Sequence, residues 1–315
     1  LLVPCLSNDA TGSEEDLGQL ETELEGQYYD VWKLSYYPAN MSNKKNAYLV
    51  YLATQKIKEI TKKDKVHVIA HSMGGLAVRG YIQNMAVDPN GSEVTYDDDI
   101  DKVVLIASPM YGSYYTNLLD EVYSKELQNR IIPSNCLFTL DYLKRQGDTN
   151  ATIDMEIGSD FTWELNKNFN KKDISYLTIS GIDAYSDLSI INVLPSIAHL
   201  FGLVSVAPYC IQNVGQRSDG IVPLQNSILL SDNVPLIVFD KTHSDIYKYS
   251  NVAKVSSLFF KNNSDYKNYY PFLNIDHGEF YYNPSINSQG NLPQELQIKG
   301  SFIIQVKPLH EQIIN

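Results

Sequence analysis

A serine stands between an apolar run and a helical pattern in the first quarter of the chain. The run Val66 to Ala70 predicts a buried strand, and helical periodicity resumes after Gly75. A serine hydroxyl is a poor nucleophile unless a base takes its proton, so it must be held clear of its own backbone beside an imidazole. A strand that turns sharply into a helix between small residues does this. Ala70 and Gly74 lie two residues before and after Ser72, which predicts Ser72 as a nucleophile.

The segment follows the G-x-S-x-G pattern with one change, because Ala70 replaces the first glycine. Alanine adds a single methyl group and can still fit a tight turn. The alternative is a helix N-terminus that happens to carry a serine followed by glycines. The buried strand directly before the serine favours the nucleophile.

The base is expected later in the chain, because in the fold that uses this turn the acid and the histidine follow the serine in that order. Six histidines are present, at positions 67, 71, 199, 243, 277 and 310. His243 alone stands just beyond a late predicted strand, Val234 to Phe239, with a helical pattern behind it. His71 neighbours the serine, but alternation along a strand points its side chain the other way. We therefore predict His243 as the base.

The acid is expected between these two residues. Asp219 lies in a polar turn, Arg217 to Pro223, and precedes the histidine by 243 − 219 = 24 residues, which suits one strand-helix step. Asp183 lies closer to the end of the preceding predicted strand and is the fallback, and Asp187 is a further candidate. A turn or helix-capping aspartate is the alternative for Asp219, since aspartate is common in such turns.

An acyl-transfer intermediate also needs two backbone N–H donors for its oxyanion. The residue after the nucleophile supplies one, which predicts Met73, and the loop after the first strand supplies the other, which predicts Leu6. That loop has Cys5 in place of the usual small glycine, and a small buried residue is favoured over a catalytic thiol. The histidines and aspartates form no metal-type cluster, and residues 97–99 are expected to be a solvated acidic face. No metal or cofactor is predicted.

The elements around these residues alternate as βα units up to about residue 110, which is typical of a parallel sheet flanked by helices. Strands are expected at about 1–4, 29–36, 66–70, 103–107, 174–179 and 234–239, and helices from about 13, at 46–61, after Gly75 and at 245–260. Residues 112–172 and 183–216 have no such order and are predicted to be insertions forming a cap. The predicted catalytic domain spans residues 1–260.

Residues 261–315 differ in character and are predicted to be a small C-terminal extension. Tyrosines are dense there, and the alternating runs 296–299 and 302–307 flank Gly300 and Ser301. This pattern predicts a β-hairpin on a two-residue turn.

Composition limits the partners of the chain. Of its 315 residues, 43% are hydrophobic, as in an ordinary globular protein, and the net charge of −12 leaves no basic surface for nucleic acid. Three cysteines allow at most one disulfide. The chain begins with Leu1 and not methionine, which suggests that a signal peptide, a leader or a longer N-terminal region has been removed, and a secreted protein is expected. The longest apolar stretch, Ile190 to Ile211, is interrupted by proline and histidine, so no transmembrane segment is predicted.

Several of these segments resemble one known group of enzymes in combination. The stretch V-I-A-H-S-M-G-G-L-A-V-R-G-Y that ends at Tyr81 resembles the nucleophile region of bacterial lipases and of related PGAP-type and lecithin-acyltransferase-like hydrolases. The next strand with its P-x-x-G-S turn, the run 158–166 and the run 218–223 are similar in order and spacing. This resemblance covers about residues 1–260 and implies an α/β-hydrolase fold with Ser72, Asp219 and His243 at the triad positions. Ala70, Cys5 and the chain after 260 depart from it.

The expected function is hydrolysis of carboxylic esters through an acyl-enzyme, by a lipase or carboxylesterase. The apolar stretch 190–211, as a cap, would favour lipid or acyl esters and would allow transient contact with a lipid interface. Two alternatives remain open. One is an acyltransferase with the same triad, and the other is a non-catalytic binding protein on this fold, although a scaffold has no need of all three residues.

Overall fold

A parallel sheet forms the centre of the protein. The computed structural model describes residues 1–5, 12–36, 41–113, 116, 150–167, 174–182, 218–229, 234–269, 273–279 and 301–306. Five strands lie in the order β1-β2-β5-β6-β7, and every neighbouring pair is parallel. They are β1 (Leu2–Val3), β2 (Val66–His71), β5 (Ile100–Ile106), β6 (Ser175–Gly181) and β7 (Leu236–Phe239). Their carboxyl ends therefore share one edge, where ligands bind in open sheets of this kind.

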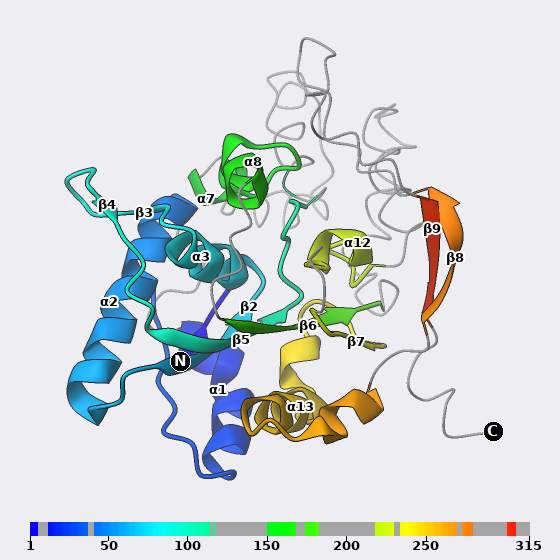
Figure 1. The fold of residues 1–315 in the computed structure, drawn as a ribbon, viewed down its shortest axis with the longest axis horizontal. Coiled ribbons are helices and arrows are strands. Elements are labelled where there is room, and N and C mark those ends of the chain that lie inside the picture. The colour runs from blue at the N-terminus through cyan, green and yellow to red at the C-terminus, as the bar shows by residue number, and fades with distance from the viewer. Residues whose placement is uncertain are drawn as a thin grey trace, which may run out of the picture.

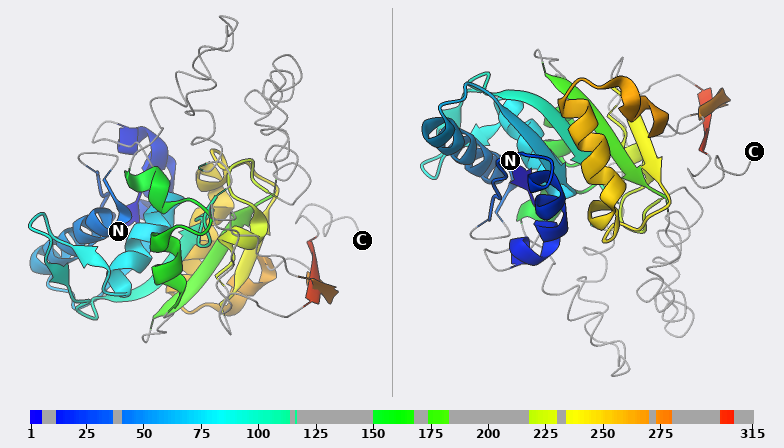
Figure 2. Two further views of the ribbon diagram at one scale, coloured as in Figure 1. Left: turned by 90° about the horizontal axis from the view of Figure 1, so that it is seen from above. Right: turned by 90° about the horizontal axis from the view of Figure 1, so that it is seen from below.

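Helices cover both faces of this sheet (Figures 1 and 2). One face carries α2 (Asn43–Thr61) and α3 (Met73–Ile82), and the other carries α1 (Gly12–Glu25) and α13 (Ser250–Phe260). Along β2, Val68 and Ala70 join the core cluster of α2 and α3, whereas Ile69 joins that of α1 and α13. Since both faces are buried, the strands are continuous apolar runs, as parallel strands require.

Two predicted elements differ from the observed ones. Residues 29–36 form no continuous strand: a single parallel bridge joins Lys33 to Leu2, because β1 is only two residues long and offers few backbone groups. The predicted helix 245–260 is divided at Tyr249, whose backbone is extended, into a 3₁₀ turn, η1 (Ile246–Lys248), and α13. The strands at 66–71, 100–106, 175–181 and 236–239 confirm the other predicted strands to within a few residues.

Shorter elements surround the sheet. They are β3 (Ala86–Val87) paired with β4 (Glu93–Val94), α7 (Asn150–Asp154), α8 (Asp160–Lys167), α12 (Leu224–Ser227) and the 3₁₀ helix η2 (Ser264–Tyr269). α7 and α8 belong to the first predicted insertion, and most of both insertions lies outside the described residues. The division into a catalytic domain, cap and extension stays a prediction. Within the described ranges, no helix has the length and apolar character to cross a membrane.

The extension contains one described pair of strands. β8 (Leu273–Glu279) and β9 (Ser301–Val306) are antiparallel, with an irregularity between Asp276 and Glu279. β9 corresponds to the second strand of the predicted hairpin. Its observed partner is β8, which the sequence pattern did not predict, and residues 296–299 lie outside the described residues.

Candidate active site

Ser72 occupies a strained turn at the carboxyl end of β2. Its φ of 54° and ψ of −126° lie where residues other than glycine are rare, at a cost of about 1–3 kcal/mol. The Ser72 N–H donates to the carbonyl oxygen of Ile106 at 2.9 Å, which ties the turn to β5. α3 begins at the next residue, so the strand passes into the helix with only Ser72 between them. The side chain is therefore raised above the end of the sheet, as the motif predicts.

The two glycines after the serine are required by close backbone contacts. A Cβ on Gly74 would lie 2.6 Å from the carbonyl oxygens of Val3 and Pro4, and one on Gly75 would overlap the side chain of Ser108. α3 thus packs directly on the end of β1 and on Ser108, which follows the end of β5. Ala70 is fully buried in the core, where its extra methyl group is accommodated. No sequence pattern predicts that Ser108 packs against Gly75, because this contact joins distant segments of the chain.

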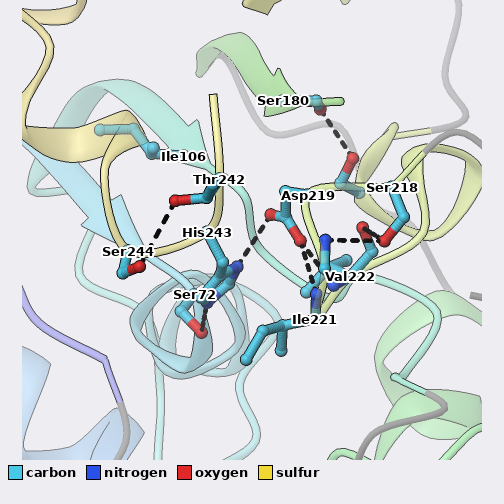
Figure 3. Close-up of polar contacts among 12 residues, drawn as sticks. Ser72, Ile106, Ser180, Ser218, Asp219, Ile221, Val222, Thr242, His243 and Ser244 are labelled. Carbon is cyan, nitrogen blue, oxygen red and sulfur yellow. Dashed lines mark hydrogen bonds and ion pairs between the residues drawn. The ribbon is translucent and has the colours of Figure 1, made fainter. Parts of the chain in front are cut away.

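Three side chains from three loops form one hydrogen-bonded chain (Figure 3). The Ser72 Oγ lies 2.9 Å from His243 Nε2, and His243 Nδ1 lies 2.8 Å from Asp219 Oδ2. A carboxylate oxygen accepts, so Nδ1 carries the imidazole hydrogen and Nε2 is left to accept from the serine hydroxyl. The exposed fractions are 8% for Ser72 and His243 and 1% for Asp219. The structure thus brings together the three residues singled out in the sequence.

The other carboxylate oxygen of Asp219 fixes the orientation of that side chain. Oδ1 accepts the N–H groups of Ile221 at 3.0 Å and Val222 at 2.7 Å (Figure 3). The carbonyl oxygen of Asp219 accepts the N–H of His243 at 2.9 Å, which joins the acid loop to the loop after β7. A Cβ on Gly181 would lie 2.8 Å from the Cβ of Asp219, so the end of β6 packs against the acid. Asp219 is both a turn aspartate and the partner of the histidine.

His71 lies beneath the loop that carries His243. Its ring is 2% exposed, its Nε2 lies 3.2 Å from the carbonyl oxygen of His243, and its centroid is 4.4 Å from that of Tyr247. These contacts are on the face covered by α1 and α13, to which alternation along β2 directs this side chain. Sequence reasoning assigned His71 no role at the site, since nothing in the sequence shows that the loop after β7 folds over it.

Of the two predicted oxyanion donors, the structure describes Met73 but not Leu6. Met73 is the first residue of α3, so its N–H has no carbonyl four residues earlier within the helix, and its side chain is buried. Leu6 lies outside the described residues, which end at Cys5 on this loop.

Burial and, secondarily, the Cys5 thiol raise the pKa of Tyr36, whose buried hydroxyl has no partner in the described part of the chain.

The remaining candidates lie elsewhere in the described chain or outside the described residues. Asp183, Asp187, His199 and His310 lie outside the described residues, and His277 lies on β8. His67 stacks on Phe260 with ring centroids 4.5 Å apart. Of the described residues, no three His, Cys, Asp or Glu side chains gather so as to hold a metal ion.

Comparison with known proteins gives a partial family match in sequence. Residues 16–135 match the family model of lecithin:cholesterol acyltransferase, a range that includes the Ser72 turn. No curated protein matches the chain.

Solved structures match over most of the chain. The mature form of the Bacillus licheniformis lipase BlEst2 is 16% identical, with a TM-score of 0.57 over 83% of this chain and 90% of that one. A metagenomic carboxyl esterase is 14% identical, with a TM-score of 0.51 over 84% of this chain and 75% of that one. The phospholipase PlaB of Legionella pneumophila is 13% identical, with a TM-score of 0.50 over 89% of this chain and 65% of that one.

These matches define the class of the protein. The chain has the α/β-hydrolase fold, with a mostly parallel sheet flanked by helices, as the sequence predicted. The resemblance to the lipase and esterase group of this fold is likewise confirmed. The chain thus shares its fold with a lipase, a carboxyl esterase and a phospholipase, and residues 16–135 share a sequence pattern with the lecithin:cholesterol acyltransferase family.

Proposed function

We propose that this protein is a serine hydrolase that cleaves carboxylic esters of lipid-type acyl groups through an acyl-enzyme on Ser72. One observation carries the proposal: the hydrogen-bonded chain from the Ser72 Oγ through His243 to the buried Asp219, set on a strained turn. A structural role for three polar residues would not require a left-handed serine backbone. Strain of this kind persists where the surrounding structure holds it for a purpose.

In the acylation step, the Ser72 Oγ attacks the ester carbonyl carbon while its proton passes to His243 Nε2. The imidazolium that forms is stabilised by Asp219 Oδ2, 2.8 Å from Nδ1. The carbonyl oxygen becomes an oxyanion, for which the Met73 N–H and, as predicted, the Leu6 N–H are the donors. Collapse of this intermediate expels the alcohol, which takes the proton from His243, and leaves the acyl group on Ser72.

Deacylation repeats these steps with water. His243 Nε2 accepts a proton from the water as its oxygen attacks the acyl carbon, and returns that proton to the Ser72 Oγ as the acid leaves. The loop hydrogen bonds of Asp219 orient its carboxylate, which keeps the hydrogen of the neutral imidazole on Nδ1 before each proton transfer. The described residues therefore provide the nucleophile, the base and the group that orients the base.

Lipid-type acyl esters are proposed as substrates for two reasons. Three proteins of similar fold are named as a lipase, a carboxyl esterase and a phospholipase. In addition, residues 190–211 are rich in Ile, Leu, Val and Phe, and a cap with these side chains would favour acyl chains over sugars or peptides. Transient contact of this cap with a lipid interface is part of the proposal.

The test is hydrolysis of p-nitrophenyl esters from short to long acyl chains by wild type, Ser72→Ala and His243→Ala. Ester hydrolysis by wild type that is lost in both variants, with unchanged circular dichroism, supports the proposal, and a long-chain optimum supports a lipase. No hydrolysis of any ester, or activity that survives Ser72→Ala, contradicts it. Wild type that binds acyl esters without turnover would favour a binding protein.

Acyl transfer is the second candidate, favoured by the match of residues 16–135 to the lecithin:cholesterol acyltransferase family. The same acyl-enzyme would then be resolved by an alcohol in place of water. Product analysis with a long-chain acceptor alcohol separates the two reactions. A new ester as the main product indicates transfer, whereas free acid at every alcohol concentration indicates hydrolysis.

A further inference from the structure

We propose that Ser113 and Asn226 are positioning residues for Asp219. Their hydrogen bonds, called the clasp below, join the acid loop and the helix after it to the turn after β5. The acid loop is residues 218–223, and the turn after β5 is residues 110–113. The proposal rests on the proposed function, in which Asp219 orients His243. It adds two residues that touch neither the substrate nor the reacting atoms.

Three hydrogen bonds join the turn to the acid loop and the helix that follows it. The Ser113 Oγ–H donates to the carbonyl oxygen of Ile221 at 2.7 Å. The Asn226 side-chain amide donates to the carbonyl oxygen of Gly112 at 2.9 Å, and the Tyr111 N–H donates to the carbonyl oxygen of Asn226 at 3.2 Å. Ser113 and Asn226 are 2% and 5% exposed, so water does not readily replace these bonds.

The same residue of the acid loop contacts both Ser113 and the catalytic acid. Ile221 gives its N–H to Asp219 Oδ1 and receives the Ser113 hydroxyl at its carbonyl oxygen. Figure 3 shows Ile221 and Val222 beside the carboxylate of Asp219, with their N–H groups directed at it. Because Oδ1 is held by these two N–H groups, the direction of Oδ2 toward His243 follows the position of the loop. A loop released from Ser113 and Asn226 would carry the carboxylate with it.

The turn after β5 is itself held from the other side. Gly112 has a φ of 90°, and a Cβ there would lie 2.7 Å from the backbone of Ile157. The carbonyl oxygen of Met110 accepts the Asn166 amide at 2.8 Å, and the Asn166 Oδ1 accepts from the buried Arg79 guanidinium at 3.0 Å. The clasp therefore connects Asp219 to the end of α8 and to α3, and not only to its own loop.

Activity in a double-mutant cycle tests whether Asn226 acts through Asp219. Asn226→Leu removes the amide at similar volume, and we expect kcat to fall by about 10²-fold, the scale of a misplacement of about 1 Å, with KM nearly unchanged. In an Asp219→Ala background, the same change should have almost no further effect on kcat, because the group that it positions is already absent. Equal losses of kcat in the two backgrounds would overturn the proposal, as would a change in KM alone.

Matched serine variants separate the clasp from a general loss of stability. Ser113→Ala should lower kcat, and Ser113→Thr, which keeps the hydroxyl, should restore most of it. Ser256→Ala is the control: Ser256 is fully buried and donates to the carbonyl oxygen of Val252 inside α13. It removes a buried hydroxyl of the same kind and should leave kcat unchanged.

A spectroscopic measurement reads the clasp without any substrate. The His243 Nδ1 proton, hydrogen-bonded to a buried carboxylate, should give a far-downfield proton NMR resonance in wild type that is absent in His243→Ala. Asn226→Leu and Ser113→Ala should shift or broaden this resonance, and Ser256→Ala should not. An unchanged resonance in both clasp variants overturns the positioning role. Absence of ester hydrolysis by wild type would contradict the proposed function separately.

Discussion

Asp219→Asn should lower kcat by several orders of magnitude while leaving the fold intact, for a reason that the geometry of the loop defines. Oδ1 accepts two backbone N–H groups and Oδ2 faces His243 Nδ1. An asparagine has one oxygen and one NH₂ group, so only one of these two positions can keep an acceptor. The asparagine oxygen can therefore accept either from the two loop N–H groups or from His243 Nδ1, but not from both.

The asparagine oxygen should keep the hydrogen bonds from the two loop N–H groups. Turning the amide so that its oxygen faces His243 aims the NH₂ group at the two N–H donors and loses two hydrogen bonds, about 1 kcal/mol each. A difference of about 2 kcal/mol is a preference of about 30-fold for the orientation that places NH₂ against Nδ1. Nδ1 must then accept, the hydrogen moves to Nε2, and His243 can no longer take the proton of Ser72. A wrong tautomer of this kind costs about 10⁴-fold in kcat.

Kinetics and stability of two variants test this reasoning together. Asp219→Asn should unfold in urea at nearly the wild-type midpoint, since the loop bonds remain, whereas Asp219→Ala leaves two buried N–H groups unpaired and should be less stable by about 1–3 kcal/mol. Both should lose about 10³- to 10⁴-fold in kcat on a p-nitrophenyl ester. An Asp219→Asn variant that keeps activity within about tenfold of wild type would refute the account of the tautomer.

Four further variants test the packing and electrostatics of the fold. Gly75→Ala should lower the free energy of unfolding by about 1–3 kcal/mol because its Cβ meets Ser108, whereas Gly18→Ala, in a helix with open space, should raise it by about 0.4–1 kcal/mol; urea unfolding measures both. Burial raises the pKa of Asp154 from 3.8 to about 6, so its contribution to stability is complete below pH 3.8 and is lost as the pH rises to about 6. As the pH rises over that range, the urea midpoint of wild type should therefore fall relative to that of Asp154→Asn. A constant difference between the two midpoints would contradict this. Lys102→Met removes a buried ammonium that donates to two carbonyl oxygens at the end of α13, and should cost about 2–3 kcal/mol with kcat unchanged, because it lies at the amino end of β5.

The grouping of Ser72, Asp219 and His243 was predictable from the sequence because it depends on local patterns in a fixed order. The turn at Ser72 needs a buried strand, small flanking residues and a helix, all within a short segment. His243 and Asp219 follow from their place after predicted strands and from a spacing of 24 residues. The hydrogen bonds between these three side chains agree with that order.

The residues that hold the site in place through packing and hydrogen bonds were not predictable in the same way. Ser108, Asn226 and Gly181 act through contacts between segments that are far apart in the chain, and no short pattern marks them. The strand expected at 29–36 has the right composition, but β1, the strand beside it among the described residues, is two residues long, so a single bridge forms. Local propensity predicts an element, whereas its length depends on the partner that the fold provides.

Labelling with a fluorophosphonate probe, followed by peptide mass spectrometry, tests the central claim most directly. The probe forms a stable adduct with a serine that has an active base, whether or not the natural ester is known. The account predicts one adduct per chain, on Ser72, that forms far more slowly in His243→Ala and Asp219→Asn. An adduct on another residue, or no adduct on a folded chain, would contradict the assignment of Ser72 as the nucleophile.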